Sequence, residues 1–120
     1  MNSQPLRILI ADDNPDIRSA LTLLLETRLN ARIVGEADCM ETLLAGVAQT
    51  HPDIVILDWE LPGLPRKSRV AALRMLHPAL KVVVTSSRPE IAQQAAAAHA
   101  DSYVSKSEPP EQVVQVIQAI

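Results

Sequence analysis

Short, continuously apolar runs alternate along the chain with longer segments in which apolar residues recur at the spacing of an amphipathic helix. The runs predict five strands, over residues 7–11, 32–37, 54–57, 81–85 and 102–104. Because these runs do not alternate between apolar and polar positions, we expect strands that are buried on both faces. Strands of this kind, separated by helices, indicate a parallel sheet of repeated βα units with helices on both sides.

Start and stop signals mark the helices that follow these strands. Three helix starts carry capping signals, which are Asn14 before Pro15, Asp38 with Glu41, and Ser87 with Glu90. The third helix is expected over residues 67–76, because the His77-Pro78 pair ends it. The fifth is expected to begin near residues 108–110 and to run to residue 120.

The composition fits one α/β domain and narrows the class of protein. With 120 residues, 48% of them hydrophobic, the chain can form one core and is too short for two. A formal charge of -3 gives no basic surface for nucleic acid. Cys39 is the single cysteine, so a disulfide framework and a thiolate zinc site are excluded. No apolar run approaches the ~20 residues that cross a bilayer, and we expect a soluble, cytoplasmic protein.

Chemically active side chains collect where the predicted strands end. They are Asp12 and Asp13 after the first strand, Asp58 after the third, Thr85 and Ser86 at the end of the fourth, and Lys106 just past the fifth. In an open parallel sheet, ligands bind beyond the carboxyl ends of the strands. Carboxylates suit a divalent cation, and a lysine beside a hydroxyl suits a phosphoryl group. Each residue alone has an ordinary explanation, but together they predict one site for Mg²⁺ and a phosphoryl group.

Three segments carry a combination of motifs that is specific when taken together. They read ILIADDNP over residues 8–15, IVILDWELPG over residues 54–63 and ADSYVSK over residues 100–106. In this order and spacing they resemble the receiver domains of bacterial two-component response regulators, over essentially the whole chain. The resemblance implies the CheY-like, flavodoxin-like (βα)5 fold, with a five-stranded parallel sheet in order 2-1-3-4-5 and helices on both faces.

The residues after Lys106 narrow the resemblance further. Ser107 stands where many receiver domains have proline, which is similar to the NarL/FixJ branch. Members of that branch usually continue into a helix-turn-helix DNA-binding domain that controls transcription. The resemblance therefore implies a single receiver domain over residues 1–120 and an output domain that is absent from this chain. From Ser86 to Lys106 the segment is slightly shorter than is common, so we expect an altered fourth helix.

The resemblance implies a role for each charged residue of the site. Asp58 is the expected phosphoacceptor, taking a phosphoryl group from a sensor histidine kinase or from a small donor such as acetyl phosphate. Mg²⁺ is expected to bind Asp13, Asp58 and the backbone carbonyl of Glu60. Asp12 is expected to support the ion mostly through water, and Lys106 to supply positive charge to the phosphoryl group. The domain is expected to assist only its own phosphorylation and dephosphorylation, and so not to be an enzyme.

The hydroxyl and aromatic positions leave alternatives open. The length of the fourth strand favours Ser86 as the hydrogen-bond donor to the phosphoryl group, with Thr85 as the alternative. Inward movement of that hydroxyl would let Tyr103 reorient and change a surface for homodimerisation, but a fixed, half-buried tyrosine fits the sequence equally well. We also expect Glu60 to contact Arg88 and so to slow hydrolysis of the aspartyl phosphate.

Other function classes fit less well. A haloacid-dehalogenase-type phosphatase has its nucleophilic aspartate first and its acidic pair late, the reverse of the order here. With only three glycines the chain has no phosphate-binding loop for a nucleotide. The remaining alternative is a degenerate receiver that acts as a phosphorylation-independent dimerisation or interaction module. The basic pair Arg66-Lys67 either contacts the kinase or simply faces water.

Overall fold

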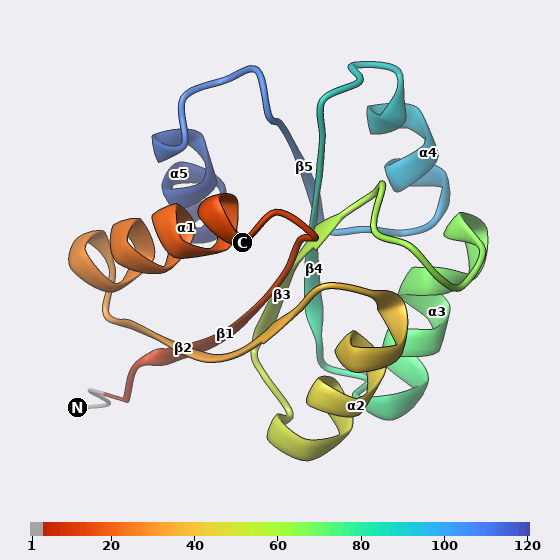
Figure 1. Cartoon of the computed structure of the whole chain (residues 1–120), viewed down its shortest axis with the longest axis horizontal. Coiled ribbons are helices and arrows are strands. Elements are labelled where there is room, and N and C mark those ends of the chain that lie inside the picture. Colours follow the sequence, from red (N-terminus) through yellow and green to blue (C-terminus); the bar gives the residue numbers. More distant parts are fainter. Residues whose placement is uncertain (1–3) are drawn as a thin grey trace.

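The computed structural model describes residues 4–120, over which strands and helices alternate along the whole chain (Figure 1). The elements are β1 (Leu6–Ala11), α1 (Pro15–Arg28), β2 (Ala31–Ala37), α2 (Met40–Thr50), β3 (Ile54–Asp58), α3 (Arg66–Leu76), β4 (Lys81–Ser86), α4 (Ile91–Ala97), β5 (Ser102–Ser105) and α5 (Glu111–Ala119). Each strand lies where an apolar run predicts it and is one residue longer than expected at one end. The prediction of five βα units is confirmed.

The strands form one parallel sheet in the order β2-β1-β3-β4-β5, which confirms the expected topology. Helices α1 and α5 cover one face of the sheet, and α2, α3 and α4 cover the other (Figure 1). Because all five strands run in the same direction, their carboxyl ends meet at one edge of the sheet. The loops that follow β1, β3, β4 and β5 therefore lie close together at that edge.

Both faces of the sheet are packed against helices, as the continuous apolar runs predict. In β3, Val55 and Leu57 belong to the core shared with α2, α3 and α4, whereas Ile54 and Ile56 belong to the core shared with α1 and α5. Side chains of successive strand residues point to opposite faces, so one run supplies both cores. Asp58 ends this buried strand and is itself only 2% exposed.

The helix starts agree only in part with their expected signals. Asn14 caps α1 as expected, because its side chain accepts a hydrogen bond from the backbone N–H of Asp16 at 2.9 Å. The expected capping box of α2 does not form, since Cys39 is the N-cap residue and the N–H of Met40 is bound by the carbonyl of Pro62 at 2.9 Å. A tertiary contact thus takes the place of the local cap.

Helix α4 differs most from expectation. The expected cap at Ser87 is wrong, because the helix begins at Ile91, after Glu90. It spans only seven residues, in keeping with the short segment between Ser86 and Lys106. Within the described part of the chain, no helix has the length and apolar character needed to cross a bilayer.

Candidate functional site

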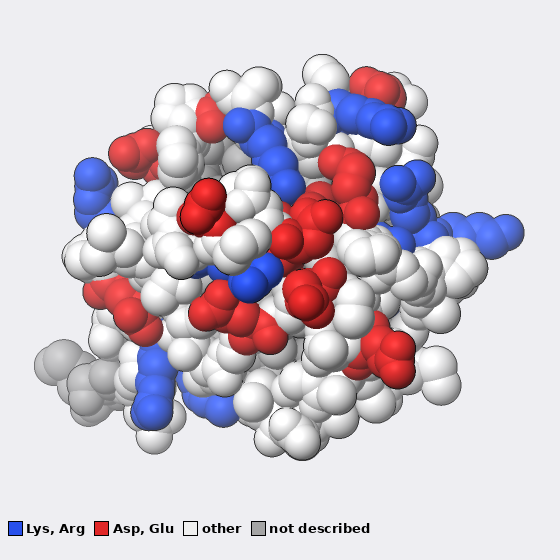
Figure 2. Space-filling view, viewed as in Figure 1, with Lys and Arg blue, Asp and Glu red and all other residues white. Residues whose placement is uncertain are grey.

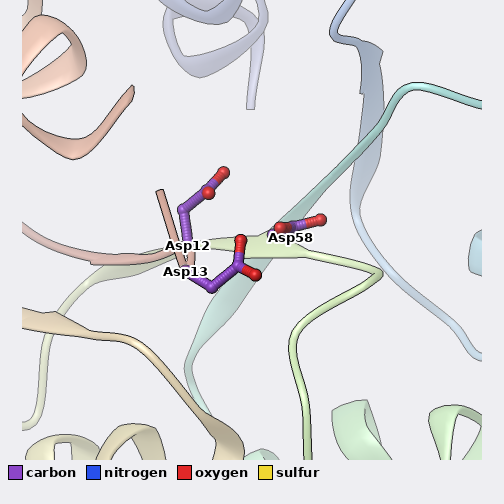
Figure 3. Close-up of side chains that lie close together, drawn as sticks. All are labelled: Asp12, Asp13 and Asp58. Atoms are coloured by element: carbon purple, nitrogen blue, oxygen red, sulfur yellow. The ribbon is translucent and has the colours of Figure 1, made fainter. Parts of the chain in front are cut away.

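Three aspartates meet at the carboxyl edge of the sheet, as the strand ends predict. Asp12 and Asp13 follow β1, Asp58 ends β3, and one carboxylate oxygen of each lies within 4.8 Å of the others (Figure 3). Asp12 and Asp58 are each 2% exposed, while Asp13 is open to solvent. Figure 2 shows acidic side chains gathered in the middle of this face. All three ligand groups are carboxylates, a set of hard oxygen donors that fits Mg²⁺.

Lys106 joins two of these aspartates. Its Nζ lies 2.8 Å from Oδ2 of Asp12 and 3.2 Å from Oδ2 of Asp58. The backbone fixes this placement, because the N–H of Lys106 donates to the carbonyl of Ser86 at 2.8 Å, where β5 pairs with β4. The ammonium group therefore partly neutralises the carboxylates of Asp12 and Asp58.

Burial and charge shift the protonation of this cluster. Burial raises the pKa of Asp58, as does the nearby charge of Asp12, whereas the N–H of Glu60 and the charge of Lys106 lower it; the net direction is upward. Burial alone would lower the pKa of Lys106, but its contacts with Asp12 and Asp58 raise it overall. The lysine is therefore held in its charged form beside an aspartate whose charged form is costly.

The loop after β3 orients the carboxylate of Asp58. Its Oδ1 accepts a hydrogen bond from the N–H of Glu60 at 3.0 Å, and its Oδ2 faces Lys106. The carbonyl of Asp58 also accepts from the N–H of Leu61 at 3.1 Å, which closes the turn. The two carboxylate oxygens are thus distinguished by different partners.

The two candidate hydroxyls lie at the end of β4 but have different surroundings. Ser86 is fully buried, and its hydroxyl donates to Glu60, whose two carboxylate oxygens each lie 3.0 Å away. Thr85 pairs in register with Asp58 and lines a cavity of about 150 Å³ whose wall also includes Asp12 and Lys106. Thr85 is therefore the hydroxyl residue in register with Asp58, whereas the Ser86 hydroxyl is bound to Glu60.

The expected contact between Glu60 and Arg88 is wrong. Across residues 4–120 no ion pair joins these two side chains. Glu60 is instead engaged by Ser86, while the backbone N–H of Arg88 donates to the Ser86 hydroxyl at 3.1 Å. The short hydroxyl reaches Glu60 from the neighbouring strand, whereas Arg88 is exposed in the loop beyond it.

Tyr103 is half-buried on β5 and ties that strand to the β4–α4 loop. Its hydroxyl donates to the carbonyl of Arg88 at 2.9 Å and lies 3.3 Å from the carbonyl of Ser86. The ring packs against the core on the α2–α3–α4 face. This contact links the position of Tyr103 directly to the loop that follows Ser86.

Two arginines were not recognised as part of the site from the sequence. Arg69 on α3 is only 4% exposed, and it donates to the carbonyls of Leu64 at 2.8 Å and Trp59 at 2.9 Å. Nε of Arg66 donates to the same Trp59 carbonyl at 3.0 Å. The sequence signal was the spacing of Arg69 four residues before Leu73, which places it on the inner face of the helix.

Comparison with known proteins decides the family. A family model described as the response regulator receiver domain matches residues 8–118. The chain belongs to this family. It is a receiver domain of a two-component response regulator, and so a signalling domain rather than an enzyme of the usual kind.

Individual relatives agree with this assignment. The response regulator GacA of Pseudomonas aeruginosa is 30% identical, over 96% of this chain and 55% of GacA. The transcriptional activator protein ExaE of Pseudomonas putida is 34% identical, over 94% of this chain and 54% of ExaE. The chain thus spans about half the length of these curated relatives. The signal receiver domain of NarL from Mycobacterium tuberculosis has a similar structure, with a TM-score of 0.86 and 25% identity over 97% of this chain and 95% of that domain.

Proposed function

We propose that this receiver domain accepts a phosphoryl group on Asp58 in the presence of Mg²⁺. The observation that carries the proposal is the cluster of three carboxylates within 4.8 Å of one another, two of which share Lys106. The donor is a sensor histidine kinase, and small phosphodonors such as acetyl phosphate can replace it. We place this transfer in the cytoplasm.

The residues of the cluster have separate roles in the transfer of the phosphoryl group. A carboxylate oxygen of Asp58 attacks the phosphorus, and the bond from phosphorus to the donor nitrogen or oxygen breaks. Asp13, Asp58 and the backbone carbonyl of Glu60 would hold Mg²⁺ directly, and Asp12 would support it mostly through water. When bound, Mg²⁺ neutralises the charge of the transferring group.

Lys106 and a hydroxyl then bind the product. The ammonium group leaves the carboxylate of Asp58 and pairs with a phosphoryl oxygen, because that oxygen carries more charge than an acylated aspartate. Ser86 donates a hydrogen bond to another phosphoryl oxygen, with Thr85 as the alternative. For Ser86 this requires its hydroxyl to leave Glu60, to which it now donates.

The conformational change that follows phosphorylation reaches the surface through Tyr103. Movement of Ser86 shifts the β4–α4 loop, whose Arg88 carbonyl holds the Tyr103 hydroxyl. The surface of α4, β5 and α5 changes as a result and favours a homodimer. In the whole protein this would control transcription through a helix-turn-helix output domain; the relative ExaE, about half of which this chain matches, is a transcriptional activator protein.

Intact mass measurement after incubation with acetyl phosphate tests the proposal. We expect the wild type to gain the mass of one phosphoryl group only when Mg²⁺ is present, and Asp58→Asn to gain none. Asp16→Asn is the matched control, because it removes the same charge from an exposed position on α1 and should be phosphorylated normally. A wild type that gains no mass under these conditions would instead support the phosphorylation-independent dimerisation module.

A further inference from the structure

The peptide group between Trp59 and Glu60 is held from both sides. Its carbonyl oxygen accepts hydrogen bonds from Nη1 of Arg69 at 2.9 Å and from Nε of Arg66 at 3.0 Å. Its N–H donates to Oδ1 of Asp58 at 3.0 Å. Two guanidinium groups and the Asp58 carboxylate are therefore connected through a single rigid peptide plane.

The burial of the charged Arg69 side chain costs free energy of desolvation. The side chain is 4% exposed, and none of the carboxylates in residues 4–120 forms an ion pair with it. Its guanidinium is satisfied by the carbonyls of Leu64 and Trp59 instead. A buried charge without a carboxylate partner carries a desolvation cost that an apolar side chain of similar length would avoid. The position therefore holds an arginine where packing alone favours methionine or leucine.

Within residues 4–120, Asp58, Arg66 and Arg69 are the side chains that bond the carbonyl or the N–H of this peptide. The N–H of Trp59 donates to the carbonyl of Thr85 at 2.8 Å, and its indole Nε1 donates to Gln94 at 3.2 Å, so both contacts anchor the residue before the peptide. The hydrogen bond from the Leu61 N–H to the Asp58 carbonyl closes the turn around this peptide, and the two arginines are the donors that hold the Trp59 carbonyl within that turn. Rotation of that carbonyl would turn the Glu60 N–H away from Asp58, because the two groups belong to one plane.

We propose that Arg69, supported by Arg66, is a positioning residue for phosphoryl transfer to Asp58. The arginines fix and polarise the Trp59–Glu60 peptide, and a polarised peptide donates a stronger hydrogen bond from its N–H. Oδ1 of Asp58 stays bound to that N–H, and Oδ2 stays directed at Lys106. This inference rests on the proposed role of Asp58 as phosphoacceptor.

The test compares Arg69→Met and Arg66→Met with the wild type. Arg74→Met is the matched control, since Arg74 lies on the same helix but donates to the carbonyl of His99 at 2.6 Å and to the carboxylate of Asp101 at 2.7 Å, and not to the Trp59 carbonyl. The first measurement is hydrogen exchange of the Glu60 amide by NMR in the metal-free protein. The second is the rate of phosphorylation by acetyl phosphate at saturating Mg²⁺.

We expect Arg69→Met to exchange the Glu60 amide at least about tenfold faster and to be phosphorylated about tenfold more slowly, because a hydrogen bond to a charged donor is lost. Arg66→Met, which leaves Arg69 in place, should change both rates in the same direction by about threefold. Arg69→Lys keeps one charged donor and should recover part of the loss. Arg74→Met should lower the denaturation midpoint. It should not change the phosphorylation rate, and it should not change the exchange rate of the Glu60 amide once that rate is corrected for the lower global stability.

A folded Arg69→Met variant with wild-type Glu60 exchange and a wild-type phosphorylation rate overturns the inference. If Arg69→Met does not fold, unchanged rates in Arg66→Met overturn it instead. A wild type that is not phosphorylated at all overturns the proposed function, and in that case the amide-exchange measurement still decides whether the arginines hold the peptide. The two failures are therefore distinguishable.

Discussion

Replacing Lys106 by methionine should destabilise the metal-free protein strongly. The ammonium group lies 2.8 Å from Asp12 and 3.2 Å from Asp58, and its side chain is 23% exposed. At an effective dielectric constant of about 20, each contact corresponds to a Coulomb attraction of about 5–6 kcal/mol. Much of this is offset by the desolvation of the three groups, and removing one partner of a buried pair costs about 3–5 kcal/mol. Because Lys106 keeps some contact with water, we expect a loss of about 3 kcal/mol.

Mg²⁺ should reverse most of that loss. Without the ammonium group the aspartates carry uncompensated charge, so the divalent ion binds them more tightly in Lys106→Met than in the wild type. A ligand present at about 100 times its dissociation constant stabilises the folded state by about 2.7 kcal/mol. The difference in unfolding free energy between the two proteins should therefore shrink as Mg²⁺ is added, even though phosphorylation of the variant is impaired.

Urea denaturation in chelator and in Mg²⁺ measures both effects. Trp59 is the single tryptophan and is fully buried, so its fluorescence reports unfolding. Lys81→Met is the control, because Lys81 is an exposed lysine at the opposite end of β4 and should show neither effect. Equal stability of Lys106→Met and the wild type in chelator, or an equal increment from Mg²⁺ in both, would refute the reasoning.

Two further changes test the site and the loop beside it. Burial raises the pKa of Asp58 above the ordinary value of an aspartate, so the folded state retains a proton that the unfolded chain releases. The free energy of unfolding of the metal-free wild type, relative to that of Asp58→Asn, should therefore fall as the pH rises through that raised pKa and level off above it. Denaturation curves recorded across pH measure this difference. A difference that stays constant with pH would contradict the prediction. Gly63 has a φ of 120°, and a Cβ placed there would lie 2.8 Å from Cβ of Met40, so Gly63→Ala should cost about 1–3 kcal/mol in thermal denaturation. Gly46→Ala is its control and should be near neutral, because its Cβ would meet only the flexible end of Leu9.

The fold and the aspartate cluster were predictable because both depend on regularities of parallel sheets. Continuous apolar runs marked the strands, and the shared direction of the strands brought Asp12, Asp58 and Lys106 to one edge. The cap of α2 was not predictable in the same way. Its first N–H is bound by the carbonyl of Pro62, a residue distant in sequence, and Cys39 rather than Asp38 is the N-cap residue.

The role of Arg69 on α3 was not predictable from the sequence, for a different reason. Its spacing four residues before Leu73 puts Arg69 on the inner face of the helix, but a long charged side chain on that face commonly extends its charged end to solvent. Its inward position follows from carbonyl groups in the β3–α3 loop that need donors, and a sequence pattern does not show where those carbonyls point. Arg66 was interpreted as half of an exposed basic pair, yet its guanidinium also turns toward Trp59.

The choice between Thr85 and Ser86 is a choice between two faces of the sheet. Val83 packs with α1 and α5, whereas Val84 packs with α2, α3 and α4. Because strand residues alternate, Thr85 falls on the first side, where it lines the cavity beside α1, and Ser86 falls on the second, where it meets Glu60. Tyr103 packs on the second side as well. A signal that passes from the phosphoryl group to Tyr103 therefore has a direct route through Ser86, and a route through Thr85 would have to cross the sheet.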